Sequence, residues 1–424
     1  MAELNYRKRG DKWEYRFETA KVDGKRKQIS KSGFATKREA IVAGTKALAE
    51  YNQAGLHFEP SDISVSDYLD YWLDTYCKMN TKYNTQLGYL SVIENHLKPK
   101  FGKYKLCALS TAIIQEYTNS LKVNGYRQNT VVDIISTLSS ALNYAVVTLQ
   151  YIKYNPCDSV KMPKFNEKKG DKRYIITPYI FNQILERFDE KTSFYIPLLI
   201  GYYTGLRLSE CFALTWDDID LENKKLTVNK AVQKRNYGVD VRQVYKRKGK
   251  KEERSAWYFT TTKTITSNRT IDIGQTLCDA LRKHHKKQLE NELEYGEYYT
   301  CIYKKPEKDE KGDTIYRLIE VEKGVECSFE RVRLINVREN GQIVSPDSMK
   351  YCSRVIHHQL LLDFNYHSLR HTHATLLIEK GVSPKSVQER LGHTSITTTL
   401  ETYVHDTDTM KKEAVDVFER AVHQ

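Results

Sequence analysis

The last quarter of the chain concentrates side chains that can move protons and hold negative charge. Five of its 12 histidines lie between residues 367 and 405, namely His367, His371, His373, His393 and His405. In the run His-Ser-Leu-Arg, His367 and Arg370 are three positions apart, so a helix would place them on one face. The imidazole can transfer a proton near neutral pH, and the guanidinium can hold an anion. The segment therefore predicts acid–base chemistry on an anionic group.

Two other interpretations of this cluster were weighed. His367 and His371 are four positions apart, as in some zinc sites. The segment lacks the glutamate of a His-Glu-x-x-His motif, and the charge of Arg370 would repel a cation, so we predict no metal site. A surface helix that is merely rich in His and Arg is the alternative that this segment alone leaves open.

Two further clusters precede it. In TGLRLSE, Gly205 ends one helix and Ser209 begins another, so Arg207 stands at a helix junction close to Glu210. A fixed planar charge suits two phosphate oxygens, although an Arg and a Glu at this spacing are more often a structural ion pair. Residues 261–273 predict two strands joined by a tight polar turn, a hairpin that would carry Lys263. Arg269, on its second strand, is a candidate for DNA contact.

Composition restricts the class of protein that could use these groups. The 424 residues are 40% hydrophobic and 29% charged, which excludes collagen-like and wholly disordered chains and predicts several globular domains. Lys and Arg exceed Asp and Glu by 67 to 54, a net charge of +13 that favours a nucleic-acid partner. The eight cysteines form no CxxC pair, and we see neither a signal peptide nor a membrane-spanning run. We expect no membrane partner and a cytoplasmic protein with reduced thiols.

Residues 1–60 predict a small basic sheet backed by a helix. Strand-like alternation at residues 12–17 and 26–30 is followed by a helix from residue 37 to 51 that Thr36 can cap. Its candidate DNA contacts are Lys12, Arg16, Lys25, Arg26 and Lys27. A sheet whose solvent face merely happens to be basic is the competing interpretation.

Residues 61–160 have helical periodicity throughout. Four helices are expected, at residues 66–76, 83–97, 110–122 and 129–149, with Pro99 closing the second, and short loops join them into a bundle. Residues 161–173 contain six basic residues, two acidic ones, a Pro and a Gly, as a linker would. Its candidate DNA contacts are Lys164, Lys168, Lys172 and Arg173, although a solvated tether fits the composition equally well.

Residues 174–424 mix helices and strands and form the predicted catalytic domain. Two charged segments, residues 242–254 and 303–325, read as surface loops or hairpins within longer inserts at 233–256 and 296–350. Residues 410–422 place apolar side chains on one helical face, which would pack within the chain or on a neighbouring subunit. The expected fold is multidomain: a small sheet-plus-helix domain, an all-α bundle and a mainly helical α+β catalytic domain.

The ordered set of motifs resembles the tyrosine recombinase family. TGLRLSE with ALTW, the TKT…S.R segment, HSLRHTHAT and LGHTSI…TLETYVH stand in family order between residues 175 and 410. The first 160 residues resemble the arm-binding and core-binding domains of lambda-type integrases. The chain is most similar to integrases of conjugative transposons from Gram-positive bacteria.

The resemblance implies a role for each residue that matches a family motif. Tyr403 would attack a DNA phosphodiester, giving a 3′-phosphotyrosine and a free 5′-hydroxyl. Arg207 and Arg370 would stabilise charge on the non-bridging oxygens.

Four more residues complete the implied site. Lys263 would protonate the leaving 5′-oxygen, and His367 would assist as general base. His393 would donate a hydrogen bond to the phosphate, and Glu210 would brace the arginine. No cofactor is implied, and the chemistry needs neither metal nor ATP.

The resemblance also implies partners and a place of action. These are double-stranded DNA with core and arm sites, a homotetramer on that DNA, accessory excision and DNA-bending proteins, and a nucleoid-associated location in a bacterial cytoplasm. The alternatives are a type IB topoisomerase-like enzyme, which shares the Tyr-Arg-Arg-Lys chemistry, and a non-catalytic DNA-binding regulator. The basic amino-terminal domain and His393 favour recombination. A regulator would have no reason to keep all six catalytic candidates, which are Arg207, Lys263, His367, Arg370, His393 and Tyr403.

Overall fold

The computed structural model describes residues 4–18, 28–54, 63–165, 175–236, 255–261 and 267–403, without the side chains of residues 18, 49–54, 398 and 401–403. The chain divides into two compact units, residues 1–166 and 167–424, which are taken in turn.

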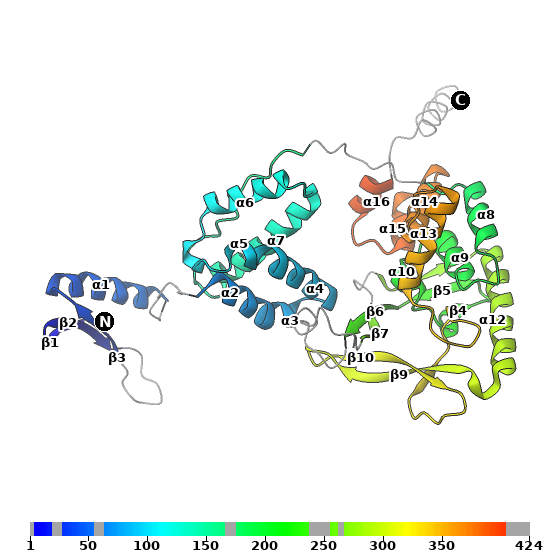
Figure 1. Ribbon diagram of the computed structural model, residues 1–424, viewed down its shortest axis with the longest axis horizontal. Helices are drawn as coiled ribbons and strands as arrows, with labels where there is room; N and C mark the ends of the chain where they lie inside the picture. The colour runs from blue at the N-terminus through cyan, green and yellow to red at the C-terminus, as the bar shows by residue number, and fades with distance from the viewer. Residues whose placement is uncertain are drawn as a thin grey trace, which may run out of the picture. The chain divides into compact units, whose positions relative to one another are not determined.

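The amino-terminal part is a three-stranded antiparallel sheet covered by one helix (Figure 1). Strands β1 (Asn5–Arg9), β2 (Lys12–Glu18) and β3 (Gln28–Phe34) precede helix α1 (Lys37–Ala54). Tyr15, Phe17 and Ala47 form the core between sheet and helix. Gly44 allows the close approach, because a Cβ there would lie 3.0 Å from the Cβ of Tyr15. The expected sheet-plus-helix domain is confirmed.

Residues 63–165 form the expected helical bundle. Its helices are α2 (Val65–Trp72), α3 (Lys78–Asn80), α4 (Tyr83–Val92), α5 (Lys98–Phe101), α6 (Thr111–Val123) and α7 (Gln128–Val147). Ser64 and Ser110 cap α2 and α6 by accepting from the backbone N–H three residues on. The apolar stripe of α7 is buried in the bundle core, as predicted.

The first two expected helices are longer than predicted because π-helical turns continue them. The turn Leu73–Cys77 joins α2 to α3, and Ile93–Leu97 joins α4 to α5. The expectation that Pro99 ends the second helix is wrong. Pro99 lies in the first turn of α5, where a missing backbone N–H is tolerated.

Among the described helices, α7 alone has the length and composition to cross a membrane. One such helix is weak evidence, and the core helix of a bundle passes the same test. Because eight residues of α7 are buried in this domain, we assign it as a core helix.

The second unit combines helices with two antiparallel sheets. Its helices are α8 (Pro178–Arg187), α9 (Tyr195–Thr204), α10 (Leu208–Cys211), α12 (Gln275–Tyr295), α13 (Met349–Leu360), α14 (Tyr366–Glu379), α15 (Pro384–Leu391) and α16 (Ile396–Tyr403). Strands β4 (Ile219–Asp220), β5 (Lys225–Val228) and β8 (Arg269–Asp272) form the smaller sheet. The larger sheet has the order β11-β9-β10-β7-β6, from β6 (Lys230–Asn236), β7 (Ser255–Thr261), β9 (Thr300–Lys308), β10 (Thr314–Glu322) and β11 (Glu330–Val332). In Figure 1, α14, α15 and α16 lie together at the opposite end of this unit from the β9–β10 ribbon.

Two expectations about strands have different outcomes. The segment at residues 303–325 contains a hairpin, since β9 and β10 pair from Thr300 and Glu322 to Lys308 and Thr314. The prediction that the strands on either side of Lys263 form a hairpin is wrong. Strand β7 pairs with β6 and β10, whereas β8 pairs with β5 in the other sheet. Strand pairing depends on partners distant in sequence, and local alternation cannot identify them.

Candidate active site

A left-handed glycine places Arg207. Helix α9 ends at Gly205, whose φ is +68°. A Cβ at this position would lie 2.7 Å from Leu391 and 3.0 Å from His373, so both backbone angle and space require glycine. The chain then turns into α10, with Arg207 as its amino-terminal cap residue.

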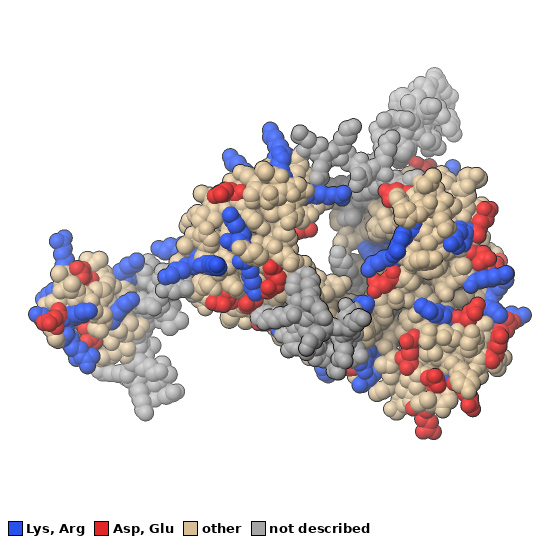
Figure 2. All heavy atoms as spheres, viewed as in Figure 1, with Lys and Arg blue, Asp and Glu red and all other residues tan. Residues whose placement is uncertain are grey.

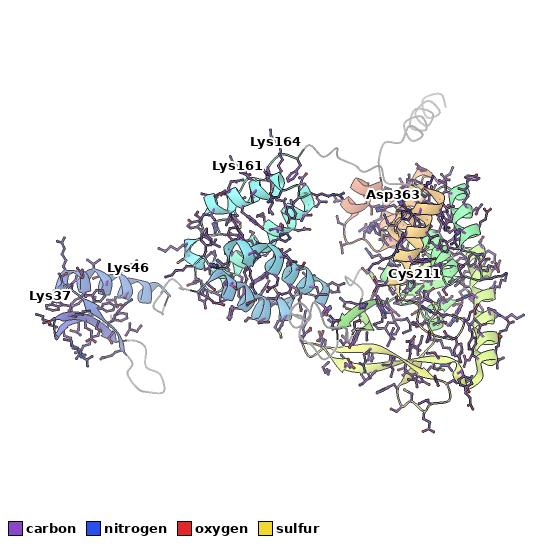
Figure 3. The ribbon with its side chains drawn as sticks, viewed as in Figure 1. Lys37, Lys46, Lys161, Lys164, Cys211 and Asp363 are labelled. Carbon is purple, nitrogen blue, oxygen red and sulfur yellow. The ribbon has the colours of Figure 1, made fainter. Side chains whose placement is uncertain are left out.

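Glu210 joins two arginines through its two carboxylate oxygens. Its Oε1 lies 2.7 Å from Arg207, and its Oε2 lies 2.9 Å from Arg269. Burial alone would raise the pKa of Glu210, but the Arg269 and Arg207 guanidiniums outweigh burial and hold that pKa below its ordinary value. Asn336 also holds α10 in place, because its side-chain amide donates a hydrogen bond to the carbonyl of Cys211, the last residue of that helix. Cys211 lies inside the second unit (Figure 3). Glu210 is therefore an ionised bridge that fixes both guanidiniums.

The pH dependence of stability tests this bridge. Because the folded-state pKa of Glu210 lies below 4.5, its ion pairs stabilise the fold above that pH and are lost as the pH falls through the folded-state pKa. We expect Glu210→Gln to lower the free energy of unfolding by about 3 kcal/mol at neutral pH, since it leaves two arginines without their buried carboxylate. Chemical denaturation should show this deficit shrinking as the pH falls below 4.5. The exposed Glu290 provides the control, Glu290→Gln, and a deficit that grows on acidification would contradict the assignment.

Helix α14 presents His367 and Arg370. Asn365 caps the helix by accepting from the backbone N–H of Ser368. Arg370 is only 1% exposed and donates to the carbonyls of Gly205 at 2.8 Å and Leu391 at 2.7 Å. His367 is exposed, and its ring packs edge to face against that of His371, with the two ring centroids 4.5 Å apart. Arg370 is thus a fixed charge inside the fold, with His367 at the surface one turn earlier.

Three consecutive carbonyls at the end of α15 accept from three different arginines. The carbonyl of Arg390 accepts from Nε of Arg269 at 2.7 Å. The carbonyls of Leu391 and Gly392 accept from Arg370 at 2.7 Å and Arg207 at 3.3 Å. The last carbonyls of a helix have no partner within it and carry partial negative charge, so they suit guanidinium groups. The end of α15 therefore brings Arg207, Arg269 and Arg370 together.

His393 follows these carbonyls directly. Its Nδ1 lies 2.9 Å from the hydroxyl of Thr399 on α16. Burial, followed by the nearby charges of Arg370 and Arg207, lowers the pKa of His393 to about 3. The imidazole is therefore neutral at physiological pH and has one N–H to donate.

The contact with Thr399 predicts an effect on catalysis. Thr399 is fully buried and lies four residues before Tyr403, so its hydroxyl ties the Tyr403 helix to His393. We expect Thr399→Val, which keeps the shape but removes this hydrogen bond, to slow the DNA cleavage implied by the resemblance about tenfold in a single-turnover assay, as loss of one hydrogen bond would. Thr399→Ser should retain most of the rate. Equal rates for the two variants would show that the hydroxyl has no role.

The remaining sequence-predicted residues are placed as follows. Tyr403 is the last residue of α16, and only its backbone is described. Lys12 and Lys164 are exposed, and Arg16 is half-buried on β2. Arg269 is 7% exposed at its side chain and is held inside the fold by Glu210 and Arg390. Outside the described residues lie Lys25, Arg26, Lys27, Lys168, Lys172, Arg173 and Lys263, together with the segments 242–254 and 410–422.

Sequence reasoning did not name Arg390, and it gave neither Thr399 nor His373 a role. Arg390 donates to His373 at 3.0 Å, and Thr399 contacts His393. Their only sequence signal is proximity to a motif, since each acts through a neighbour that the sequence does not identify.

Three parts of the chain match known domain families. Residues 177–410, more than half of the chain, match the phage integrase family. Residues 64–122 match the phage integrase N-terminal SAM-like domain, and residues 5–50 match an arm DNA-binding domain.

Individual relatives extend over almost the whole chain. A "Tyrosine recombinase XerC-like" protein of Caldanaerobacter subterraneus subsp. tengcongensis is 26% identical over 417 residues, covering 97% of each chain. The "ICEBs1 integrase" of Bacillus subtilis is 24% identical and covers 90% of this chain and 89% of its own.

Solved structures share the fold. The Tn1549 transposon integrase in complex with transposon right end DNA has a TM-score of 0.60 at 21% identity, covering 83% of this chain and 98% of its own. A lambda integrase tetramer bound to a Holliday junction has a TM-score of 0.53 at 16% identity, covering 94% of this chain and 97% of its own. With the site geometry and the match over residues 177–410, these findings show that the chain belongs to the phage integrase family and is a tyrosine recombinase of the lambda-integrase type.

Proposed function

We propose that this site-specific recombinase cuts and rejoins DNA through Tyr403 to integrate and excise a mobile element. The observation that carries the proposal is the meeting of Arg207, Arg370 and His393 at the end of α15, directly before the helix that ends at Tyr403. Two fixed positive charges and one N–H donor therefore meet at the turn that leads into α16, whose last residue is Tyr403.

The proposed reaction is a balanced exchange of phosphate esters. The Tyr403 oxygen forms a bond to phosphorus while the bond from phosphorus to the 5′-oxygen breaks, leaving a 3′-phosphotyrosine. His367 accepts the tyrosine proton, and Lys263 gives a proton to the leaving 5′-oxygen. Attack by the 5′-hydroxyl of another strand reverses these steps. One ester replaces another at each step, so no external energy source is needed.

The two arginines have different tasks in this proposal. The Arg207 side chain is 28% exposed and can bind a non-bridging oxygen directly. Arg370 is almost fully buried, so it supplies a fixed positive charge beside His393. Charges held in place before the reaction need no reorganisation as negative charge builds on the phosphate. Arg269 then acts as a support for Glu210 and α15 in place of the DNA contact expected from sequence.

We assign the domains by their matches and their surfaces. Residues 1–60 bind accessory arm sites, residues 61–160 bind the core site, residues 161–173 link them to the catalytic domain, and residues 174–424 perform the chemistry. Figure 2 shows lysines and arginines on the visible faces of both units, interspersed with acidic residues. The start of the linker is anchored to α6, since Gln115 exchanges two hydrogen bonds with the backbone of Lys161 at 2.8 Å each. Lys161 and Lys164 project from that edge (Figure 3), which leaves their charge available to a phosphate backbone.

The proposal extends to the assembly and to the place of action. Four copies act on paired core sites, as in the lambda integrase tetramer on a Holliday junction. Accessory excision and DNA-bending proteins set the direction of the reaction, because the chemical steps themselves are nearly isoenergetic. The protein acts in the bacterial cytoplasm on nucleoid DNA.

A plasmid assay tests the function. The substrate carries DNA from both ends of the element that encodes this chain, and the products are deletion circles and relaxed plasmid. We expect deletion circles from the unaltered protein when the accessory proteins are supplied, also with EDTA. Relaxation without deletion would identify a topoisomerase-like enzyme, and binding without either product would identify a DNA-binding regulator.

Deleting residues 1–60 tests whether arm-site binding and core-site cleavage belong to separate parts of the chain. We expect the shortened protein to bind arm-site DNA about 10³-fold more weakly, at the level of non-specific binding. It should still cleave a core-site substrate, because residues 61–424 contain the core-binding and catalytic parts. Gel-shift and cleavage assays on separate arm and core DNA measure this, and loss of all core cleavage would contradict a separable arm domain.

A further inference from the structure

The guanidinium of Arg390 connects helix α15 to three other elements. Nε donates to Nε2 of His373 on α14 at 3.0 Å, and one terminal nitrogen donates to the carbonyl of Asp272 on β8 at 2.9 Å. The other terminal nitrogen donates to the carbonyl of Tyr203 on α9 at 3.3 Å. All three nitrogens therefore have acceptors within the catalytic unit.

The contacts of His373 fix its hydrogen-bonding state. Its Nδ1 lies 3.0 Å from the carbonyl of Tyr202, which can only accept, so the proton is on Nδ1. Its Nε2 is then free to accept from Arg390. Burial and the charge of Arg390 lower the pKa of His373 to about 4, so this arrangement persists at physiological pH. His373 thus accepts a hydrogen bond from Arg390 at Nε2 and donates one from Nδ1 to the last turn of α9.

These contacts surround the residues of the proposed site. Helix α9 leads through Gly205 to Arg207, α14 carries Arg370, and β8 begins with Arg269. The carbonyl of Arg390 itself accepts from Arg269, and the next two carbonyls accept from Arg370 and Arg207. A change in the position of this turn would therefore move three guanidiniums at once.

We propose that Arg390, which is hydrogen-bonded to His373, is a positioning residue for DNA cleavage. It holds the last turn of α15 so that the carbonyls of Leu391 and Gly392 aim Arg370 and Arg207 at the scissile phosphate. The inference rests on the proposed function, and it adds a residue that acts on the phosphate only through other arginines.

The shape of the guanidinium matters more than its charge in this role. The three acceptors lie on three elements, and only a planar fork with three nitrogens reaches them together. Lysine keeps the charge but has one nitrogen, so Arg390→Lys separates geometry from charge. His373→Gln tests the same turn from α14 and serves if Arg390→Lys does not fold. Arg282→Lys is the matched control, because Arg282 bonds Asp279 and the carbonyl of Leu221 on an exposed surface.

The experiment measures three quantities for each full-length variant. These are the single-turnover cleavage rate on a nicked suicide substrate at saturating protein, the affinity for the same DNA, and the thermal midpoint. The cleavage assay is repeated on a substrate whose scissile group is a methylphosphonate, which lacks the negative charge that arginines neutralise.

We expect Arg390→Lys to cleave the natural phosphate about 100-fold more slowly, as a small misplacement of catalytic groups would produce. His373→Gln should lose about tenfold, and DNA affinity should stay within about threefold for both. The deficit should fall to less than about fivefold on the methylphosphonate, because the aimed charges matter less there. Arg282→Lys should behave as the unaltered protein.

Three results for Arg390→Lys would overturn the inference alone. An equal loss of cleavage rate and DNA affinity would make Arg390 a direct DNA contact. An unchanged cleavage rate, or a deficit that is as large on the methylphosphonate as on the natural phosphate, would show that Arg390 does not position the arginines. Absence of a Tyr403-dependent adduct with the unaltered protein would instead overturn the proposed function, and this inference with it.

Discussion

We expect Tyr403→Phe to form no covalent adduct with DNA while binding its sites with unchanged affinity. In the proposed reaction the phenolic oxygen is the atom that becomes linked to phosphorus, and phenylalanine has the same ring without it. The loss should therefore be complete within detection, at least about 10⁴-fold in cleavage rate, as for removal of a catalytic nucleophile. A denaturing gel of labelled suicide substrate measures adduct, and a gel shift measures binding.

The control for this variant is a second tyrosine. Tyr316→Phe alters a tyrosine on β10, in the larger sheet, and should leave adduct formation unchanged. Residual adduct from Tyr403→Phe would show that another of the 30 tyrosines is the nucleophile.

Arg370→Lys should show the second largest effect. The guanidinium of Arg370 donates to the carbonyls of Gly205 and Leu391 at the same time. A lysine ammonium cannot make both hydrogen bonds while its charge stays in the same position. We expect cleavage to fall about 10²- to 10³-fold, the usual result of losing one preorganised group that stabilises transition-state charge.

DNA binding separates this effect from a loss of affinity. Arg370 is 1% exposed, so it can contribute little direct contact with DNA, and the affinity of Arg370→Lys should change by less than about threefold. Arg187→Lys is a suitable control, because Arg187 is exposed, donates to Gln359 and lies over the ring of Phe188, away from the residues of the proposed site. A parallel loss of affinity and cleavage would mean that Arg370 serves binding and not the reaction.

The helices could be predicted from sequence because their signals are local. Ser110, Asn365 and Ser383 each accept from a backbone N–H three residues on, and apolar periodicity fixes the buried faces. The bundle and α14 to α16 follow from such signals. The order of the motifs along the chain indicates the family without any geometry.

The failures concern interactions between distant residues. The hairpin expected around Lys263 is absent because β7 and β8 join different sheets. Arg269 is a candidate DNA contact from the sequence, which gives no sign that its side chain is 7% exposed and pairs with Glu210, 59 positions away. The carbonyls at the end of α15 are backbone atoms that every residue carries, so no residue type marks them as the organisers of the arginines.

Mapping the DNA-linked amino acid tests the central claim most directly. The unaltered protein is trapped on a suicide substrate in the presence of EDTA, the adduct is digested with protease and nuclease, and the modified peptide is identified by mass spectrometry. We predict a single nucleotide-bearing peptide with the 3′-phosphate on Tyr403. A phosphate on any other residue, or a link to the 5′ end of the DNA, would contradict the account.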